Sequence, residues 1–156
     1  MDVFIHNTEE MDAFAREIVL SIMHKRQQEH DANEKSGACI IGLSGELGAG
    51  KTTFAKSFAR ALNVLEPIPS PTFVLARFYY IPDSHEFARL VHIDAYRIEK
   101  TSELAVLDWV GLQADAKNLI LVEWPEQLKE LFPQDATILT FEVVDETTRK
   151  VSTNFK

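Results

Sequence analysis

The eight residues from Gly45 to Thr52 read GELGAGKT and match the pattern G-x-x-x-x-G-K-[ST] at every fixed position. In such a loop, glycines let backbone amides turn toward phosphate oxygens, because a side chain there would block the approach. Lys51 would place its charge on the β- and γ-phosphates, and Thr52 would offer its hydroxyl to Mg²⁺. We call residues 45–50 the glycine-rich loop and predict that it binds a nucleotide. The expected nucleotide-binding residues are Glu46, Leu47, Gly48, Ala49, Gly50, Lys51, Thr52 and Thr53.

Two acidic residues end apolar runs downstream of this loop and are candidates for a metal and water site. The run LVHID ends at Asp94, and the run LILVE ends at Glu123. Ligand sites in open α/β sheets lie outside the carboxyl ends of the strands, which is where both acids would fall. We predict that Thr52 and both acids contact Mg²⁺ or its waters, and that Lys51 and both acids act in catalysis. The spacing leaves open which acid holds the metal and which orders the attacking water.

Three residues close to these acids each allow two interpretations. Arg97 could reach the γ-phosphate or a partner surface, or it could simply pair with an exposed acidic neighbour. Trp124 directly follows Glu123, and an indole in this position more often packs than takes part in catalysis. His92 is placed on the same strand face as Asp94, where it could support the acid, although a structural role is favoured.

The stretch EPIPSPTF, residues 66–73, carries three prolines and two hydroxyl residues, Ser70 and Thr72. Proline fixes φ and favours extended conformations in the preceding residue, so the segment has few conformations available. It lies between the helix that follows the glycine-rich loop and the next strand, where NTPases place a loop that senses the γ-phosphate. We therefore assign Thr72 a catalytic role. The alternative is a plain proline-rich connection to an edge strand.

Strands alternate with helices along most of the chain, which predicts a three-layer α/β domain of the P-loop NTPase type. Its central sheet should be mostly parallel or mixed and flanked by helices, within one domain spanning residues 1–156. Thr8 should cap the first helix, and Thr101 or Ser102 a later short one. The N-terminal helix and the last thirty residues are expected to cover the sheet. Expected strands are 2–6, 38–43, 72–80, 88–94, 118–123, 136–144 and 150–155; expected helices are 8–28, 51–62, 101–109 and 125–132.

The composition of the chain argues against direct nucleic-acid binding, a disulfide, a cysteine-based zinc site and membrane association. Sixteen basic and twenty-four acidic residues give a formal charge of −8, which disfavours direct binding of nucleic acid. One cysteine, Cys39, excludes an internal disulfide and a cysteine-based zinc cluster. No run approaches eighteen consecutive apolar residues and the N-terminus shows no secretory signal, so we expect no membrane association.

The ordered set of motifs GELGAGKTT, SPTF, HIDAYR and EWPE resembles one family. In this order and at these separations, the motifs are similar to those of the bacterial ATPase of tRNA threonylcarbamoyladenosine (t6A) synthesis, the TsaE family, formerly YjeE. The resemblance covers roughly residues 40 to 128. Residues 102–111 depart from the family pattern, because Ala105 replaces its second acid and Asp108 lies near the glycine. Because this segment differs from the family pattern, the sequence does not identify the surface that would contact a partner.

The resemblance implies a small cytoplasmic protein that binds ATP or ADP with Mg²⁺ and hydrolyses ATP weakly by itself. We expect the protein to be a monomer when alone. It implies two protein partners, TsaD and TsaB, which carry the threonylcarbamoyl transfer to adenosine 37 of tRNA, so that tRNA is reached only through them. Adenine as the base is also inferred from the resemblance, together with the lack of an N-K-x-D guanine motif.

Two other function classes remain open at this stage. A small P-loop kinase would transfer the γ-phosphoryl group to a metabolite, but such kinases usually close an arginine-rich lid, and the five arginines after residue 45 are not clustered. A nucleotide-gated adaptor with negligible turnover would bind ATP and partners without hydrolysis. Phosphate release without an acceptor, stimulated by the partners, would favour the ATPase.

We predict that Thr72→Ala leaves ADP binding largely intact but reduces ATP hydrolysis, because only the γ-phosphate would contact this hydroxyl. Calorimetric ADP binding and phosphate release with the partners present measure the two effects. Unchanged hydrolysis in this variant would return the stretch 66–73 to a plain connection.

Overall fold

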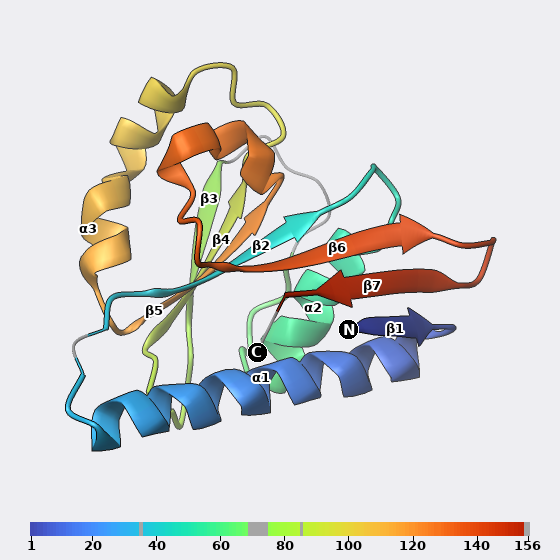
Figure 1. The fold of residues 1–156 in the computed structure, drawn as a ribbon, viewed down its shortest axis with the longest axis horizontal. Coiled ribbons are helices and arrows are strands. Elements are labelled where there is room, and N and C mark those ends of the chain that lie inside the picture. The colour runs from blue at the N-terminus through green and yellow to red at the C-terminus, as the bar shows by residue number, and fades with distance from the viewer. Residues whose placement is uncertain (35, 69–74, 85, 155–156) are drawn as a thin grey trace.

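The computed structural model describes residues 1–34, 36–68, 75–84 and 86–154. Its centre is a seven-stranded sheet in the order β1-β7-β6-β2-β5-β4-β3 (Figure 1). The strands are β1 (Asp2–Ile5), β2 (Cys39–Ser44), β3 (Ala76–Tyr80), β4 (Arg89–Asp94), β5 (Asn118–Glu123), β6 (Thr137–Val143) and β7 (Arg149–Thr153). The α-helices are α1 (Thr8–Asp31), α2 (Lys51–Ala61) and α3 (Trp109–Ala114), and the 3₁₀ helices are η1 (Thr101–Leu107) and η2 (Pro125–Leu131).

The sheet is mixed, as the alternation of elements predicted. Strands β4, β5, β2 and β6 run parallel to one another, and β4 is joined to its neighbour β5 by a crossover that contains η1 and α3. The predicted hairpins β3–β4 and β6–β7 are antiparallel, and β1 adds antiparallel to β7. The carboxyl ends of β2, β4 and β5 therefore lie along one edge of the sheet.

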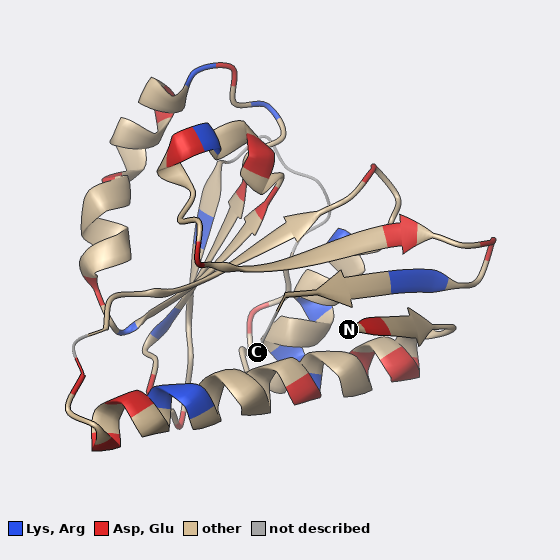
Figure 2. Cartoon of the chain, viewed as in Figure 1, with Lys and Arg blue, Asp and Glu red and all other residues tan. Residues whose placement is uncertain are grey.

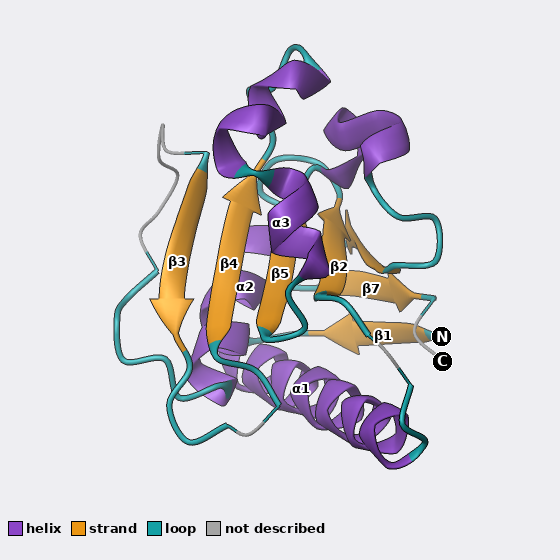
Figure 3. Ribbon diagram, turned by 90° about the vertical axis from the view of Figure 1, so that its left-hand side faces the viewer, coloured by secondary structure: helices purple, strands orange, loops and turns teal. Residues whose placement is uncertain are grey.

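Helices cover both faces of the sheet and form two separate cores (Figure 3). Along β5, Leu119 and Leu121 pack with α1 and α2, whereas Ile120 and Val122 pack with η1, α3 and η2. All six residues of β5 are buried, which explains why this strand reads as a continuous apolar run and not as an alternating one. The predicted three-layer α/β fold is confirmed.

The N-cap of α1 is Asn7, and the prediction of Thr8 was wrong by one residue. Asn7 has extended backbone angles, and its side-chain oxygen accepts a hydrogen bond from the backbone N–H of Glu10 at 2.8 Å. Thr8 is already the first residue of the helix, so it is not the cap. The sequence alone could not separate these adjacent cap residues, because both types satisfy the same orphan donors.

Two further expectations need correction. The segment 101–107 is a 3₁₀ helix capped at Lys100, not at Thr101 or Ser102, because the Glu103 carboxylate accepts the backbone N–H groups of Glu99 and Lys100 at 2.9 and 3.2 Å. The last thirty residues do not cover the sheet. They extend it through β6 and β7, and β1 completes that side.

None of the helices in the described ranges is both long enough and apolar enough to cross a membrane.

We predict that Asn7→Ala lowers the free energy of unfolding by about 1 kcal/mol, because it removes the side-chain acceptor for an orphan helix N–H. Urea denaturation of this variant and of Thr8→Ala provides the comparison. An equal or larger loss in Thr8→Ala would contradict the assignment of the cap to Asn7.

Candidate functional site

The glycine-rich loop connects the end of β2 to the start of α2, as predicted from its flanking apolar residues. Gly45 passes so close to β6 that a Cβ there would lie 2.5 Å from the carbonyl oxygen of Phe141. Gly48 has a φ of +80°, and nothing lies within 4 Å of where its Cβ would be. The first glycine thus anchors the loop on the sheet, and the second leaves its backbone open to a ligand. Behind the loop, the first turn of α2 adds backbone N–H groups without intrahelical partners.

Lys51, the first residue of α2, is buried in this site with 4% of its surface exposed. Its ammonium donates a hydrogen bond to the carbonyl oxygen of Gly45 and lies 3.4 Å from the ring centroid of Trp124. Burial lowers the pKa of Lys51, while nearby carboxylates, Glu123 foremost, act in the opposite direction. The lysine is therefore held between the loop and an aromatic face, in a place where a cation is poorly solvated and attracts anions strongly.

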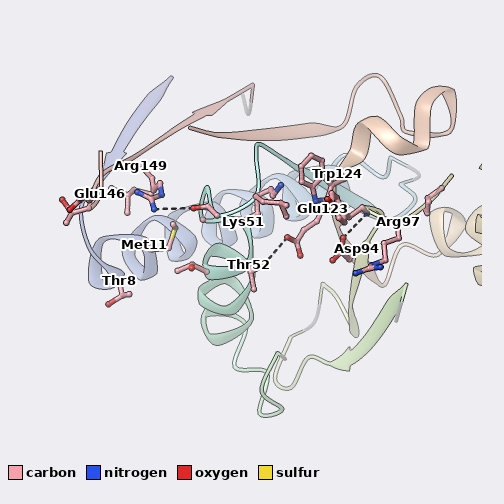
Figure 4. A pocket seen from close by; sticks show the side chains of 18 of the residues that line it. Thr8, Met11, Lys51, Thr52, Asp94, Arg97, Glu123, Trp124, Glu146 and Arg149 are labelled. Carbon is pink, nitrogen blue, oxygen red and sulfur yellow. Dashed lines mark hydrogen bonds between the residues drawn. The ribbon is translucent and has the colours of Figure 1, made fainter. Parts of the chain in front are cut away.

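Asp94 and Glu123 meet at the edge of the sheet, because parallel pairing of β4 with β5 places them directly opposite each other. The hydroxyl of Thr52 lies 3.4 Å from Oε1 of Glu123 (Figure 4). Oδ1 of Asp94 accepts the backbone N–H of Tyr96 at 3.1 Å. The structure thus brings Asp94 and Glu123 to Lys51 and Thr52, although Asp94 lies 42 positions after Thr52 and Glu123 lies 29 positions after Asp94.

The two acids are electrostatically coupled. Burial raises the pKa of Asp94, and the negative charge of Glu123 adds to the increase, although the hydrogen bond from Tyr96 partly opposes it. Glu123 has 5% of its surface exposed. A buried pair of like charges is unfavourable unless a cation balances it, and Lys51 contributes part of that balance. A carboxyl in a cavity with a perturbed pKa, such as Asp94, is typical of functional sites.

His92 contacts the second acid, not the one on its own strand. Its Nε2 lies 2.7 Å from Oε2 of Glu123, and both side chains are nearly buried. The sequence placed His92 beside Asp94 because residues two positions apart on a strand share one face. The contact with Glu123 depends on the register of β4 against β5, which no local pattern reports.

Trp124 has a φ of +63°, in the left-handed region that a non-glycine residue seldom adopts. This turn between β5 and η2 directs the indole over Lys51, and the ring of Tyr96 packs on it with centroids 5.0 Å apart. Trp124 is therefore a packing residue, as the sequence favoured, but the group that it packs on is Lys51 of the site. A strained backbone at this place suggests a functional constraint.

The site opens into a cavity of about 780 Å³ that runs well beyond the glycine-rich loop. One end holds Asp94, Arg97, Glu123 and Trp124, and the other lies between the start of α1 and the β6–β7 turn (Figure 4). Sequence analysis missed the second end, which is lined by Ile5, Asn7, Thr8, Met11, Glu146, Thr147 and Arg149.

Arg149, at the start of β7, links the second end to the loop. Its guanidinium donates to the backbone carbonyl of Asp145 at 2.9 Å and to that of Gly48 at 3.4 Å. No motif marks Arg149 in the sequence, and only the antiparallel return of β7 beside β6 brings it to the loop.

The donor set fits Mg²⁺ that arrives with a nucleotide. Thr52, Asp94 and Glu123 offer hard oxygen ligands on one wall of the cavity. Mg²⁺ is typically held by one or two carboxylates together with substrate phosphates and waters. Within the described ranges, no group of three or more His, Cys, Asp or Glu side chains could hold a metal ion alone. The residues thus suit a shared metal site better than a self-contained one.

Ser70, Pro71 and Thr72 lie outside the described residues, so the catalytic role of Thr72 stays a prediction. Cys39 is away from this cavity, and burial raises the pKa of its thiol to about 11, which makes it a poor nucleophile.

We predict that Asp94→Asn stabilises the protein without nucleotide or metal at pH 7, because it removes a buried charge but keeps the oxygen that accepts from Tyr96. The folded pKa of Asp94 is raised above 3.8, so the charged carboxyl costs stability only as pH rises above that value. Thermal unfolding in a chelator should show a higher Tm for Asp94→Asn at pH 7 and no difference near pH 3.5. A gain that is the same at both pH values would contradict this account.

Comparisons with known proteins agree with the motifs. The family model described as "Threonylcarbamoyl adenosine biosynthesis protein TsaE" matches residues 5–151. A protein of Aquifex aeolicus named "tRNA threonylcarbamoyladenosine biosynthesis protein TsaE" is 39% identical over 117 residues, covering 74% of this chain and 76% of its own length. A Mycobacterium tuberculosis protein of the same name is 38% identical over 118 residues, covering 73% of this chain and 70% of its own.

The fold has a match among solved structures. A crystal structure of YdiB from Bacillus subtilis superposes with a TM-score of 0.65 at 25% sequence identity, covering all of this chain and 86% of the other. The resemblance inferred from four short motifs is thereby confirmed over nearly the full length, including the N-terminal helix and the final hairpin, which carry no motif. The chain belongs to the TsaE family.

Proposed function

We propose that this protein is a Mg²⁺-dependent ATPase that supports t6A modification of tRNA. The observation that carries the proposal is the convergence of Lys51, Thr52, Asp94 and Glu123 on one wall of the cavity beside the glycine-rich loop. A buried cation, a metal-binding hydroxyl and two acids are the parts that phosphoryl transfer to water requires. The names of the relatives supply the pathway.

The cavity suggests how ATP or ADP lies. The phosphates would contact the backbone of residues 46–53, where Gly48 leaves the loop open. The base would then extend toward the second end of the cavity, between Ile5 and Met11 on one side and the β6–β7 turn on the other. Apolar side chains with a few polar groups, as at Asn7 and Thr8, suit a flat base with polar edges.

The proposed reaction is attack of a water oxygen on the γ-phosphorus while the bond to the ADP oxygen breaks. Lys51 and the amides at the start of α2 stabilise the charge that develops on the phosphate oxygens. Thr52, Asp94 and Glu123 would hold Mg²⁺, which would supply positive charge to the phosphate groups. One acid orients the metal waters and the other orients the attacking water and can accept its proton. Of the two acids, Glu123 is the one whose Oε1 lies 3.4 Å from the hydroxyl of Thr52.

Lys51 would have to exchange partners during this reaction. Its ammonium now bonds to the carbonyl of Gly45 and lies over the ring of Trp124, so binding of phosphate by Lys51 would replace at least one of these contacts. Because burial already weakens its solvation, contact with an anion would be favourable.

We propose protein partners of the TsaD and TsaB kind, with tRNA reached only through them, and a cytoplasmic site of action. Lys and Arg in the described ranges are distributed over several elements, including α1, α2, β3 and β7 (Figure 2). Together with the charge of −8, this distribution disfavours direct tRNA binding.

We predict that Glu123→Gln lowers ATP turnover by about a hundredfold, the size expected for loss of a general base or a water-orienting acid. Phosphate release should be measured with no acceptor, with and without the TsaD- and TsaB-type partners. Glu130→Gln, an exposed residue of η2, is the matched control and should keep full turnover.

Three results would contradict the proposal in different ways. Turnover that requires a small-molecule acceptor would indicate a kinase. ATP binding without hydrolysis, even with partners, would indicate an adaptor. Equal turnover in Glu123→Gln and wild type would remove Glu123 from the reaction.

A further inference from the structure

The carboxylate of Glu123 is held from two sides. Oε2 lies 2.7 Å from Nε2 of His92 on β4, and Oε1 lies 3.4 Å from the hydroxyl of Thr52 on α2. The side chains of His92 and Glu123 are 11% and 6% exposed, so little water competes for this contact. Each oxygen of the acid therefore has its own neighbour, and the two neighbours come from different elements.

Sheet register places the imidazole where it can do this. Asp94 pairs with Glu123 across β4 and β5, and His92 pairs with Leu121, so His92 and Glu123 are diagonal neighbours on one face. Diagonal pairs on a sheet are within reach of long or aromatic side chains. The imidazole contributes a flat group with two side-chain torsions, whereas glutamate has three that must be fixed. A hydrogen bond from the stiffer group restricts the more flexible one.

The direction of the bond follows from the chemistry of its members. A carboxylate can only accept, so Nε2 of His92 must carry the hydrogen. Oε2 is then occupied, and Oε1 is the oxygen that faces Thr52 and the glycine-rich loop. This is the pattern by which outer residues orient the acids and ligands of an active site.

We propose that His92 is a positioning residue for Glu123: its Nε2–H holds Oε2 so that Oε1 points toward Thr52 and the loop. The inference rests on the proposed ATPase function, and it adds a residue that acts through Glu123 without touching the nucleotide. Loss of His92 should release the Glu123 side chain into several orientations. The nucleotide would still bind, but fewer complexes would have the acid in place.

A purely structural role for His92 makes different predictions. It would change the stability of the fold, with kcat preserved in the folded fraction. A positioning role changes kcat, keeps KM for Mg·ATP nearly constant, and is restored by any side chain that returns an N–H to the same place. Glutamine can do so, because its amide nitrogen reaches about as far as Nε2 of histidine.

The kinetic test compares His92→Ala, His92→Gln and the control His24→Ala, a change on the exposed side of α1. With partners present, we expect kcat of His92→Ala to fall about tenfold or more, as is typical when outer-shell partners are lost, with KM changed less than about twofold. His92→Gln should recover much of kcat, and His24→Ala should match wild type. An unchanged kcat in His92→Ala, or an equal loss in the Ala and Gln variants, would overturn the proposal.

A second measurement does not depend on activity. Nitrogen-15 NMR of the histidine rings in the wild-type protein should show His92 as the tautomer with hydrogen on Nε2, slow to exchange with water. In Glu123→Gln this exchange should become faster. A hydrogen on Nδ1 alone, or no change in Glu123→Gln, would overturn the proposal even if His92→Ala failed to fold. A wild-type protein without turnover would refute the ATPase, whereas this NMR result would still decide the role of His92.

Discussion

The parallel pairing of β4 with β5 is the constraint on which the candidate site depends. It sets Asp94 opposite Glu123 and places His92 diagonally behind the second acid. Because β2 lies on the other side of β5 in the same direction, the glycine-rich loop starts at the same edge. A register shift of one residue would turn the acids into the opposite face, where apolar side chains pack with η1 and η2. The register of the sheet thus determines the geometry of the site.

This arrangement works against stability at its centre. Two carboxylates and an ammonium lie close together in partly or fully buried positions, and Trp124 adopts a left-handed backbone. The cost is offset by the surrounding packing, since β5 is buried along its whole length between two apolar cores. Rigid neighbours on both faces keep the charged groups in place when relaxation would otherwise separate them.

Several side chains in the site connect elements that are distant in sequence. Lys51 on α2 contacts Trp124 after β5, and Arg149 on β7 bonds to the loop after β2. The β6–β7 turn and the start of α1 close the second end of the cavity. The terminal segments, which carry no motif, therefore line the cavity as well as extending the sheet. The family match, from residue 5 to residue 151, includes both segments.

The sequence by itself determined the fold class, the bounds of most strands, and the main chemical groups. Glycine spacing, an apolar run ending in Asp94 and another ending in Glu123 are local patterns, and local patterns report local geometry. The tertiary structure alone decided that His92 contacts Glu123, that Trp124 covers Lys51, and that Arg149 reaches the loop. These contacts depend on strand order and register, which arise from long-range packing of two cores and leave no periodicity in the chain. The cap at Asn7 differs for a smaller reason, because two adjacent polar residues could each satisfy the helix and only the backbone angles select one.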